Sequence, residues 1–263
     1  MTSIALSSGK GGVGKSSIAL NLGVILAQAG KKVIVVDADV AMSNLALMIG
    51  VDRIPITLNN VLAGENDILD AVYDGPSGMK YVPAQLAVDK LDRLNFDDLP
   101  KAIQKLEEHA DYVLIDCPPG WGPDAKAAIA SAKQGIIVLT PEPPALADAI
   151  KTRSFMEKRN VDVLGAVLNM VLNDPVEIKK SEIESPQLLG VRVIAVLPED
   201  IEVRRATALQ VPVVIKNPSA PFSKALLGLA ESITREKMYI KETKPKKGVI
   251  KGLLDFILGI FHK

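Results

Sequence analysis

The chain has 263 residues, of which 48% are hydrophobic and 24% charged. Its 31 lysines and arginines balance 31 aspartates and glutamates, so a net charge of zero gives no general reason to expect a nucleic-acid partner. This length and composition suffice to bury a sizeable core, which favours one large α/β domain. The single cysteine, Cys117, excludes an intramolecular disulfide and a CxxC pair for zinc or an iron–sulfur cluster.

The same features favour a cytoplasmic protein. A lone cysteine is typical of a reducing compartment. Because Met1 runs directly into a strand-like segment, we expect no secretory signal peptide, and no apolar stretch is long enough to span a bilayer.

Short β-branched runs alternate with longer amphipathic runs along the chain. The short runs predict buried strands at residues 4–6, 32–36, 79–82, 112–115, 135–139, 164–168 and 191–197. The amphipathic runs predict helices that begin near Lys15 and cover residues 99–109, 143–159 and 219–237. Residues 52–98 are less regular and predict one or two short helices besides their strand. The alternation predicts a mostly parallel sheet with helices on both faces and a ligand site at the carboxyl ends of the strands.

Residues 8–17 read SGKGGVGKSS and fit the phosphate-loop pattern G-x-x-x-x-G-K-[ST], with a strand before the loop and a helix after it. Glycines lack a Cβ atom, so the backbone can wrap around an anion and point its N–H groups at phosphate oxygens. Lys15 supplies a charge at the β- and γ-phosphates, and the Ser16 hydroxyl can bind Mg²⁺. The predicted ATP-binding loop consists of Gly9, Lys10, Gly11, Gly12, Val13, Gly14, Lys15, Ser16 and Ser17.

The run from Lys10 to Ser16 carries a second lysine and resembles the deviant Walker A motif, K-G-G-x-G-K-[ST], of the MinD/ParA ATPase family. The resemblance extends at the level of motifs over residues 1–237 and implies a P-loop NTPase fold of the SIMIBI type. It also implies that Lys10 reaches the ATP held by a second copy, which gives a sandwich homodimer, and that Lys10 and Lys15 are catalytic. A cation from the partner would neutralise charge on the transferred phosphoryl group. The residues alone fit a solvated loop lysine equally well.

The second predicted strand ends in the sequence VVDAD, and Asn44 follows in a pattern that resembles the first switch of the family, D-x-D-x-x-x-x-N. Carboxylates beside a magnesium triphosphate can orient the attacking water or metal-bound water. The resemblance implies that Asp39 is catalytic and lies at the metal, and that Asp37 and Asn44 support the site. Capping of the following helix explains Asp37 equally well.

Residues 112–120, YVLIDCPPG, form an apolar strand that ends in an acid and resemble the family's Walker B and second switch, D-x-P-P-G. The resemblance implies that Asp116 contacts Mg²⁺ through water and that Pro119 and Gly120 follow the γ-phosphate. The implied metal residues are therefore Ser16, Asp39 and Asp116. We interpret Cys117 as a packed side chain, and Trp121 as either a partner-facing or a packed loop residue.

No N-K-x-D element of the kind that binds guanine follows any later strand, so adenine is the preferred base. Asn169 and the Pro198, Glu199 and Asp200 segment match places where proteins of this family hold adenine. Helix capping is an alternative explanation for both.

The carboxyl-terminal residues combine charge and apolarity. We divide the chain into an ATPase domain (1–238), a charged linker (239–248) and an amphipathic helix (249–263). On a helix, Lys251, Asp255 and His262 share one polar stripe. A helix of about 20 Å is shorter than the roughly 30 Å hydrocarbon core, so it can lie in a membrane interface but cannot span it. The predicted membrane residues are Ile250, Leu253, Leu254, Phe256, Ile257, Ile260 and Phe261.

These features predict a Mg²⁺-dependent ATPase of MinD type, whose ATP-bound homodimer lies on the anionic inner face of the cell membrane until hydrolysis releases it. Its role would be spatial regulation, such as placement of the division septum, with a protein activator of unknown identity. Alternatives are a ParA-type partition ATPase that binds DNA without sequence preference and an FlhG-type regulator of flagellar number. The apolar tail makes DNA the less favoured partner, although that tail could instead pack on its own domain or on another subunit.

Overall fold

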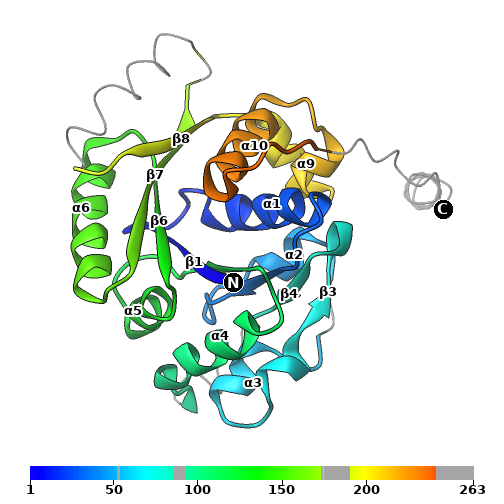
Figure 1. The fold of residues 1–263 in the computed structure, drawn as a ribbon, viewed down its shortest axis with the longest axis vertical. Coiled ribbons are helices and arrows are strands. Elements are labelled where there is room, and N and C mark those ends of the chain that lie inside the picture. Colours follow the sequence, from blue (N-terminus) through cyan, green and yellow to red (C-terminus); the bar gives the residue numbers. More distant parts are fainter. Residues whose placement is uncertain (52–53, 86–92, 173, 175–189, 241–263) are drawn as a thin grey trace, which may run out of the picture.

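Eight strands form one sheet in the computed structural model, which describes residues 1–51, 54–85, 93–172, 174 and 190–240 (Figure 1). Their order is β3-β4-β2-β5-β1-β6-β7-β8, and neighbours are parallel except β3 and β4. The strands are β1 (Thr2–Ser7), β2 (Val33–Asp37), β3 (Tyr73–Asp74), β4 (Lys80–Val82), β5 (Tyr112–Asp116), β6 (Gln134–Leu139), β7 (Asp162–Val171) and β8 (Val193–Pro198).

Helices cover both faces of this sheet (Figure 1). The α-helices are α1 (Lys15–Gln28), α2 (Leu45–Met48), α3 (Leu58–Leu62), α4 (Leu99–Glu107), α5 (Pro123–Ala130), α6 (Pro143–Lys158), α8 (Ile201–Ala208), α9 (Val213–Lys216) and α10 (Pro221–Thr234). Short 3-10 helices are η1 (Ile68–Ala71), η2 (Pro76–Gly78) and η4 (Phe96–Asp98). None of the helices that the structure describes is long and apolar enough to cross a membrane.

Two hydrophobic clusters, one on each face, explain why the central strands are apolar at every position. In β5, Leu114 packs with the cluster that contains α1 and α10, whereas Val113 and Ile115 pack with the cluster of α4, α5 and α6. All three side chains are fully buried. Parallel strands covered by helices on both faces require this near-continuous apolar sequence.

The predicted α/β architecture, a mostly parallel sheet between two helical layers, is confirmed. The predicted helix at residues 219–237 is shorter in the structure: α10 begins at Pro221, a favoured first position, and ends where Arg235 takes a left-handed φ of 58°. The sequence analysis missed α5, α9 and the antiparallel edge strand β3, and it included the start of α8 only through the capping alternative for Asp200. The linker from residue 241 onward, and the whole of the predicted helix 249–263 with its membrane residues, lie outside the described residues.

We expect Leu114→Ala to lower the free energy of unfolding by roughly 2–5 kcal/mol, because it opens a cavity in the middle of the sheet. Leu69→Ala in η1 is the control, because that side chain is 37% exposed and should contribute less than about 1 kcal/mol. Urea denaturation measures both. Similar losses in the two variants would contradict the assignment of Leu114 to the core.

Candidate functional site

The loops that carry the sequence motifs meet at one edge of the sheet. β1, β2, β5 and β8 end at this carboxyl edge, and the phosphate loop, Asp37, Asp116 and Pro198 lie at or directly after those ends. Asn169 differs from its prediction, because β7 continues to Val171 with an irregular register and Asn169 lies within the strand. A parallel sheet places ligands at this edge.

The phosphate loop needs its glycines for backbone and steric reasons. Gly12 and Gly14 have left-handed φ angles of 77° and 91°. A Cβ atom on Gly9 would lie 2.3 Å from Cβ of Asp148, and one on Gly14 would lie 2.3 Å from Nδ2 of Asn169. Larger residues at these positions would strain the loop or displace its neighbours.

Side chains inside the loop form a short hydrogen-bonded chain. The mostly buried Lys15 donates from Nζ to Ser8 Oγ at 3.1 Å, and Ser8 Oγ donates to the Lys10 carbonyl at 2.6 Å. The half-buried Lys10 side chain has no ion pair or hydrogen bond with any other residue that the structure describes. Lys15 is therefore aimed inward, while the Lys10 ammonium is free to meet an incoming group.

Two neighbouring segments hold this loop. Asn169 Nδ2 donates to the Val13 carbonyl at 2.8 Å, and Gly120 N donates to the Ser8 carbonyl at 3.2 Å. A Cβ atom on Gly11 would lie 3.8 Å from Cβ of Pro119. The predicted second switch is therefore in direct contact with the phosphate loop.

Asp37 is fully buried and organises the loop after β2. Its carboxylate accepts hydrogen bonds from Asp39 N at 3.1 Å, Ser43 Oγ at 2.8 Å, Asn44 N at 3.3 Å and Leu45 N at 3.2 Å. Because Asn44 N and Leu45 N lie at the start of α2, Asp37 both anchors the first switch and caps this short helix.

The other two residues of the predicted first switch point elsewhere in the loop. Asp39 is partly exposed, and its Oδ1 accepts a hydrogen bond from Met42 N at 2.9 Å. Asn44 donates from Nδ2 to the Met42 carbonyl at 2.8 Å. Both side chains therefore shape the switch loop, and the second carboxylate oxygen of the partly exposed Asp39 has no hydrogen bond with any described residue.

Asp37 and Asp116 stand side by side as register partners on β2 and β5. Burial raises the pKa of Asp37 to about 6. Burial, and then the charge of Asp37, raise the pKa of Asp116 to about 7, although a hydrogen bond from Ser16 and the charge of Lys15 oppose the shift. Two carboxylates this close favour a shared proton or a bound cation.

Asp116 also has an unmet polar atom. Its Oδ1 is buried and has no hydrogen-bond partner among the described residues. Such an atom costs free energy, and a divalent cation would remove the cost. The oxygen donors of Asp116 and Ser16 suit Mg²⁺, which usually binds one or two protein ligands together with substrate phosphates. No group of three or more His, Cys, Asp or Glu residues able to hold a metal occurs in the described part of the chain.

A pocket opens beside the phosphate loop and brings the residues predicted for adenine together. It joins Asn169, Pro198, Glu199 and Asp200 to Gly14 and Ser17 of the loop. The sequence analysis missed four further lining residues: Met170, Val203, Arg204 and Phe222. Val203, Arg204 and Phe222 come from α8 and α10, whose position over the loop no local pattern reveals.

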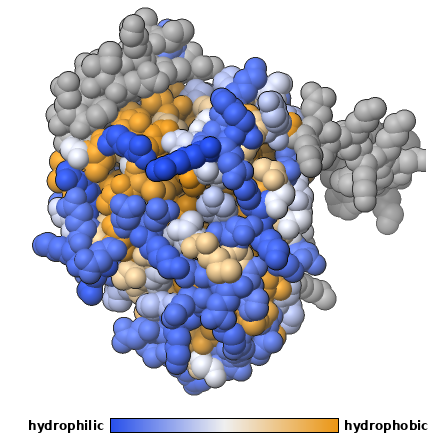
Figure 2. All heavy atoms as spheres, in the orientation of Figure 1, coloured by the Kyte–Doolittle hydropathy of each residue, from blue (hydrophilic) through white to orange (hydrophobic). Residues whose placement is uncertain are grey.

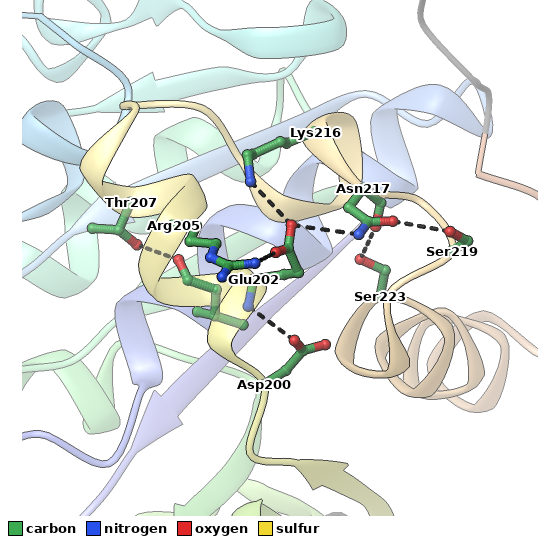
Figure 3. A network of polar contacts seen from close by, with 9 residues as sticks. Asp200, Glu202, Arg205, Thr207, Lys216, Asn217, Ser219 and Ser223 are labelled. Atoms are coloured by element: carbon green, nitrogen blue, oxygen red, sulfur yellow. Dashed lines mark hydrogen bonds and ion pairs between the residues drawn. The ribbon is translucent and has the colours of Figure 1, made fainter.

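A network of polar contacts fixes the walls of this pocket (Figure 3). Asp200 accepts hydrogen bonds from Glu202 N at 2.9 Å and from Phe222 N at 3.2 Å, so one carboxylate caps both α8 and α10. Helix capping therefore accounts for both of its oxygens. Glu202 in turn accepts hydrogen bonds from Arg205, Lys216 and Asn217, which lower its pKa to about 2.

The remaining motif residues are packed. Cys117 is 1% exposed, and burial raises the pKa of its thiol far above the usual range. A buried, protonated thiol is a poor nucleophile and a poor metal ligand. Trp121 packs edge-on against Phe155 with ring centroids 6.0 Å apart, which favours the packed interpretation of this residue.

Known proteins share this fold and these motifs. Residues 1–234 match the ParA family model, described as NUBPL iron-transfer P-loop NTPase. An uncharacterised ATP-binding protein of Methanocaldococcus jannaschii is 40% identical over 260 residues, 99% of this chain and 97% of its own.

Two solved structures are also similar to the chain. The cell division ATPase MinD of Pyrococcus furiosus is 34% identical with a TM-score of 0.84, over 89% of this chain and 98% of its own. The septum site-determining protein MinD of Pyrococcus horikoshii, complexed with Mg-ADP, is 33% identical with a TM-score of 0.83, over 88% and 95%.

The carboxylate pair predicts a specific dependence of stability on pH in the absence of Mg²⁺. The folded pKa values of about 6 and about 7 lie above the ordinary value of 3.8, so the native chain binds more protons than the unfolded chain in this window. The pair's contribution to the free energy of unfolding therefore falls as pH rises from about 4 to about 7.

Asp116→Asn isolates this effect. We expect the stability of the variant relative to the native chain to rise by roughly 2–4 kcal/mol between pH 4 and pH 7.5, measured by urea denaturation. A difference that does not change with pH would show that Asp116 titrates normally.

We expect Asp200→Ala to weaken ADP binding about tenfold, because the walls built from α8 and α10 lose their common cap. Each lost cap also costs about 0.5–2 kcal/mol of stability. Calorimetric titration with Mg-ADP measures the affinity. Ser219→Ala is the control, because Ser219 bonds Asn217 in the same network at 2.9 Å but does not line the pocket. An unchanged affinity in Asp200→Ala would exclude a role for this network in nucleotide binding.

Proposed function

Because the chain belongs to the ParA family of P-loop NTPases, we propose that it is a Mg²⁺-dependent ATPase that dimerises around ATP and attaches reversibly to membranes. Hydrolysis would release the protein from the membrane, so the rate of hydrolysis would set how long the dimer stays attached. The observation that carries the proposal is the phosphate loop itself, with Lys15 turned inward onto Ser8 and the Lys10 ammonium unpaired among the described residues.

The geometry supports distinct roles for these residues. Lys15 and the loop N–H groups would bind the phosphates. Ser16 and Asp116 would hold Mg²⁺, and Asp39 would lie next to the ion. Bound Mg²⁺ would supply positive charge next to the phosphate oxygens. The partly exposed Asp39 would orient the attacking water. Water would then add to the γ-phosphorus as the bond to ADP breaks, which releases ADP and phosphate.

Lys10 explains why a dimer is part of the proposal. An ammonium with no partner among the described residues of its own chain can cross to the phosphates of a facing copy, where it would neutralise charge in the transition state. Gly120 N bonds the phosphate loop through Ser8, so rearrangement at the γ-phosphate would be transmitted to the surface around the second switch. That surface is where we place the contact with a protein activator.

The proposed membrane anchor lies beyond the described residues and rests on the sequence of residues 249–263. Its apolar residues surround a narrow polar stripe, and four lysines at 244, 246, 247 and 251 would favour an anionic surface by about 1 kcal/mol each. Two anchors in a dimer bind more tightly than one. The septum site-determining name of the Pyrococcus horikoshii relative supports spatial regulation as the process served.

Iron transfer, which the family description names, is less favoured by this chain. Iron–sulfur clusters are held by cysteine thiolates, and the only cysteine in the sequence, Cys117, is 1% exposed with a raised thiol pKa. A homodimer would offer two such buried thiols and no more.

We expect the native chain to sediment with phosphatidylglycerol vesicles in ATP and to remain in solution in ADP. Ile257→Glu should abolish sedimentation because it puts a charge on the apolar face. His262→Glu introduces the same charge on the polar stripe and should retain most of the binding. Lys10→Ala should bind ATP but lose ATP-dependent sedimentation, because dimerisation fails.

Sheared DNA in the same assay separates the competing function. Salt-sensitive, ATP-dependent binding to DNA without binding to vesicles would replace the membrane proposal with a partition function. Equal sedimentation of Ile257→Glu and His262→Glu would show that the tail is not the anchor.

A further inference from the structure

A second pocket with charged walls lies at the opposite, amino edge of the sheet. Its volume is about 240 Å³, and it is lined by the start of β6, the first half of β7, the start of β8 and the end of α10. Figure 2 shows strongly hydrophilic side chains lying across a mainly apolar area in the region where Figure 1 places β7, β8 and α10. We call this cavity the amino-edge arginine pocket.

Two arginines supply its positive charge. Arg192 precedes β8, and Arg235 follows the last residue of α10. Arg192 donates one hydrogen bond from Nε to the Leu164 carbonyl at 2.9 Å, and its terminal nitrogens bond no residue in the described part of the chain. Neither guanidinium group has an ion pair with any residue in the described ranges. Both arginines are exposed, so their guanidinium groups can take up an anion from solution.

The acids near this pocket are already engaged. Glu231 pairs with Lys237 at 3.6 Å, and Glu236 pairs with Lys31 at 2.8 Å. Asp162 accepts a hydrogen bond from Gln134 Nε2 at 3.3 Å, and Gln134 lines the pocket. The carboxyl end of a helix carries a partial negative charge, which disfavours an anion. Binding of an anion at the end of α10 therefore depends on both arginines.

The backbone around the pocket is arranged to place these two side chains. Gly165 has a φ of 151°, and a Cβ atom there would lie 2.7 Å from the Arg192 carbonyl oxygen and 2.5 Å from Ile194 Cγ2. Arg235 has a left-handed φ of 58°, at a position where glycine is usually found. An arginine at this position costs stability that a glycine would not.

We propose that the amino-edge arginine pocket binds a phosphate-ester anion between Arg192 and Arg235. Guanidinium groups form paired hydrogen bonds with phosphate oxygens, and two of them would neutralise one phosphate. The other walls include Leu164, Ile194 and Ile233, which suit an ester with carbon attached better than an inorganic ion. The ester is either a free metabolite or the headgroup of an acidic lipid.

The test uses the full-length chain saturated with Mg-ADP, so that added phosphate esters cannot enter the phosphate loop. NMR of arginine Nε–H groups follows titration with glycerol 3-phosphate or with monomeric dihexanoyl phosphatidylglycerol. We expect the Arg192 and Arg235 signals to shift together and saturate with one Kd in the millimolar range or tighter. Saturation with glycerol 3-phosphate identifies a free ester, and saturation only with the lipid identifies a headgroup.

Arg235→Gly separates binding from folding. Glycine suits the left-handed backbone, so the variant should keep or raise the thermal midpoint while its affinity falls at least tenfold. Arg192→Lys keeps a cation next to the pocket but loses the planar fork, and should weaken binding without unfolding the chain. Lys224→Gln removes one exposed charge from α10 away from the pocket and should change Kd less than twofold.

Three results would overturn the proposal. They are shifts that grow linearly without saturation for both ligands, equal losses in Lys224→Gln and Arg235→Gly, and full affinity in Arg235→Gly. None of them bears on ATP hydrolysis, because the two pockets lie at opposite edges of the sheet and the phosphate loop is filled throughout.

Discussion

Two carboxylates that are buried side by side organise the functional edge of this protein. Parallel register brings Asp37 at the end of β2 next to Asp116 at the end of β5. Water cannot solvate either group, so their charge must be met by hydrogen bonds, protons or a cation. Asp37 uses four hydrogen bonds from the first switch, whereas Asp116 keeps one oxygen without a partner among the described residues. Asp37 therefore stabilises the loop of the first switch, and Asp116 keeps an oxygen that can bind a ligand.

The two acids have different roles at the site: Asp37 has a structural role, and Asp116 has a chemical one. Asp37 cannot leave its partners without releasing residues 39–45, which form the first switch and the start of α2. Asp116 lies beside Ser16 and Lys15, so a change in its protonation alters the charge next to the phosphate loop. A metal that binds Asp116 displaces its proton and removes the repulsion between the pair at the same time.

The sequence predicted the central layers and the phosphate loop well because both depend on local signals. Apolar runs specified the buried strands, and SGKGGVGKSS needed its glycines for reasons that the loop geometry bears out. The lining of the pocket beside the phosphate loop was only partly predicted. Phe222 and Gly14 line the same pocket although they are 208 positions apart in the sequence. No local pattern could therefore indicate that α10 lies over the phosphate loop. The capping alternative for Asp200 was sound, since both of its oxygens accept backbone N–H groups.

Helix α10 connects the two edges of the molecule. Phe222 in its first turn lines the pocket beside the phosphate loop, and Arg235 just beyond its last turn lines the amino-edge arginine pocket. This 14-residue helix is about 21 Å long, so it spans the distance between the two pockets' edges of the sheet. Asp200 joins the start of α10 to α8, and α10 packs against strand β8 of the sheet. If nucleotide binding changes the affinity of the amino-edge arginine pocket for an anion, linkage requires that the anion change the affinity for the nucleotide by the same factor.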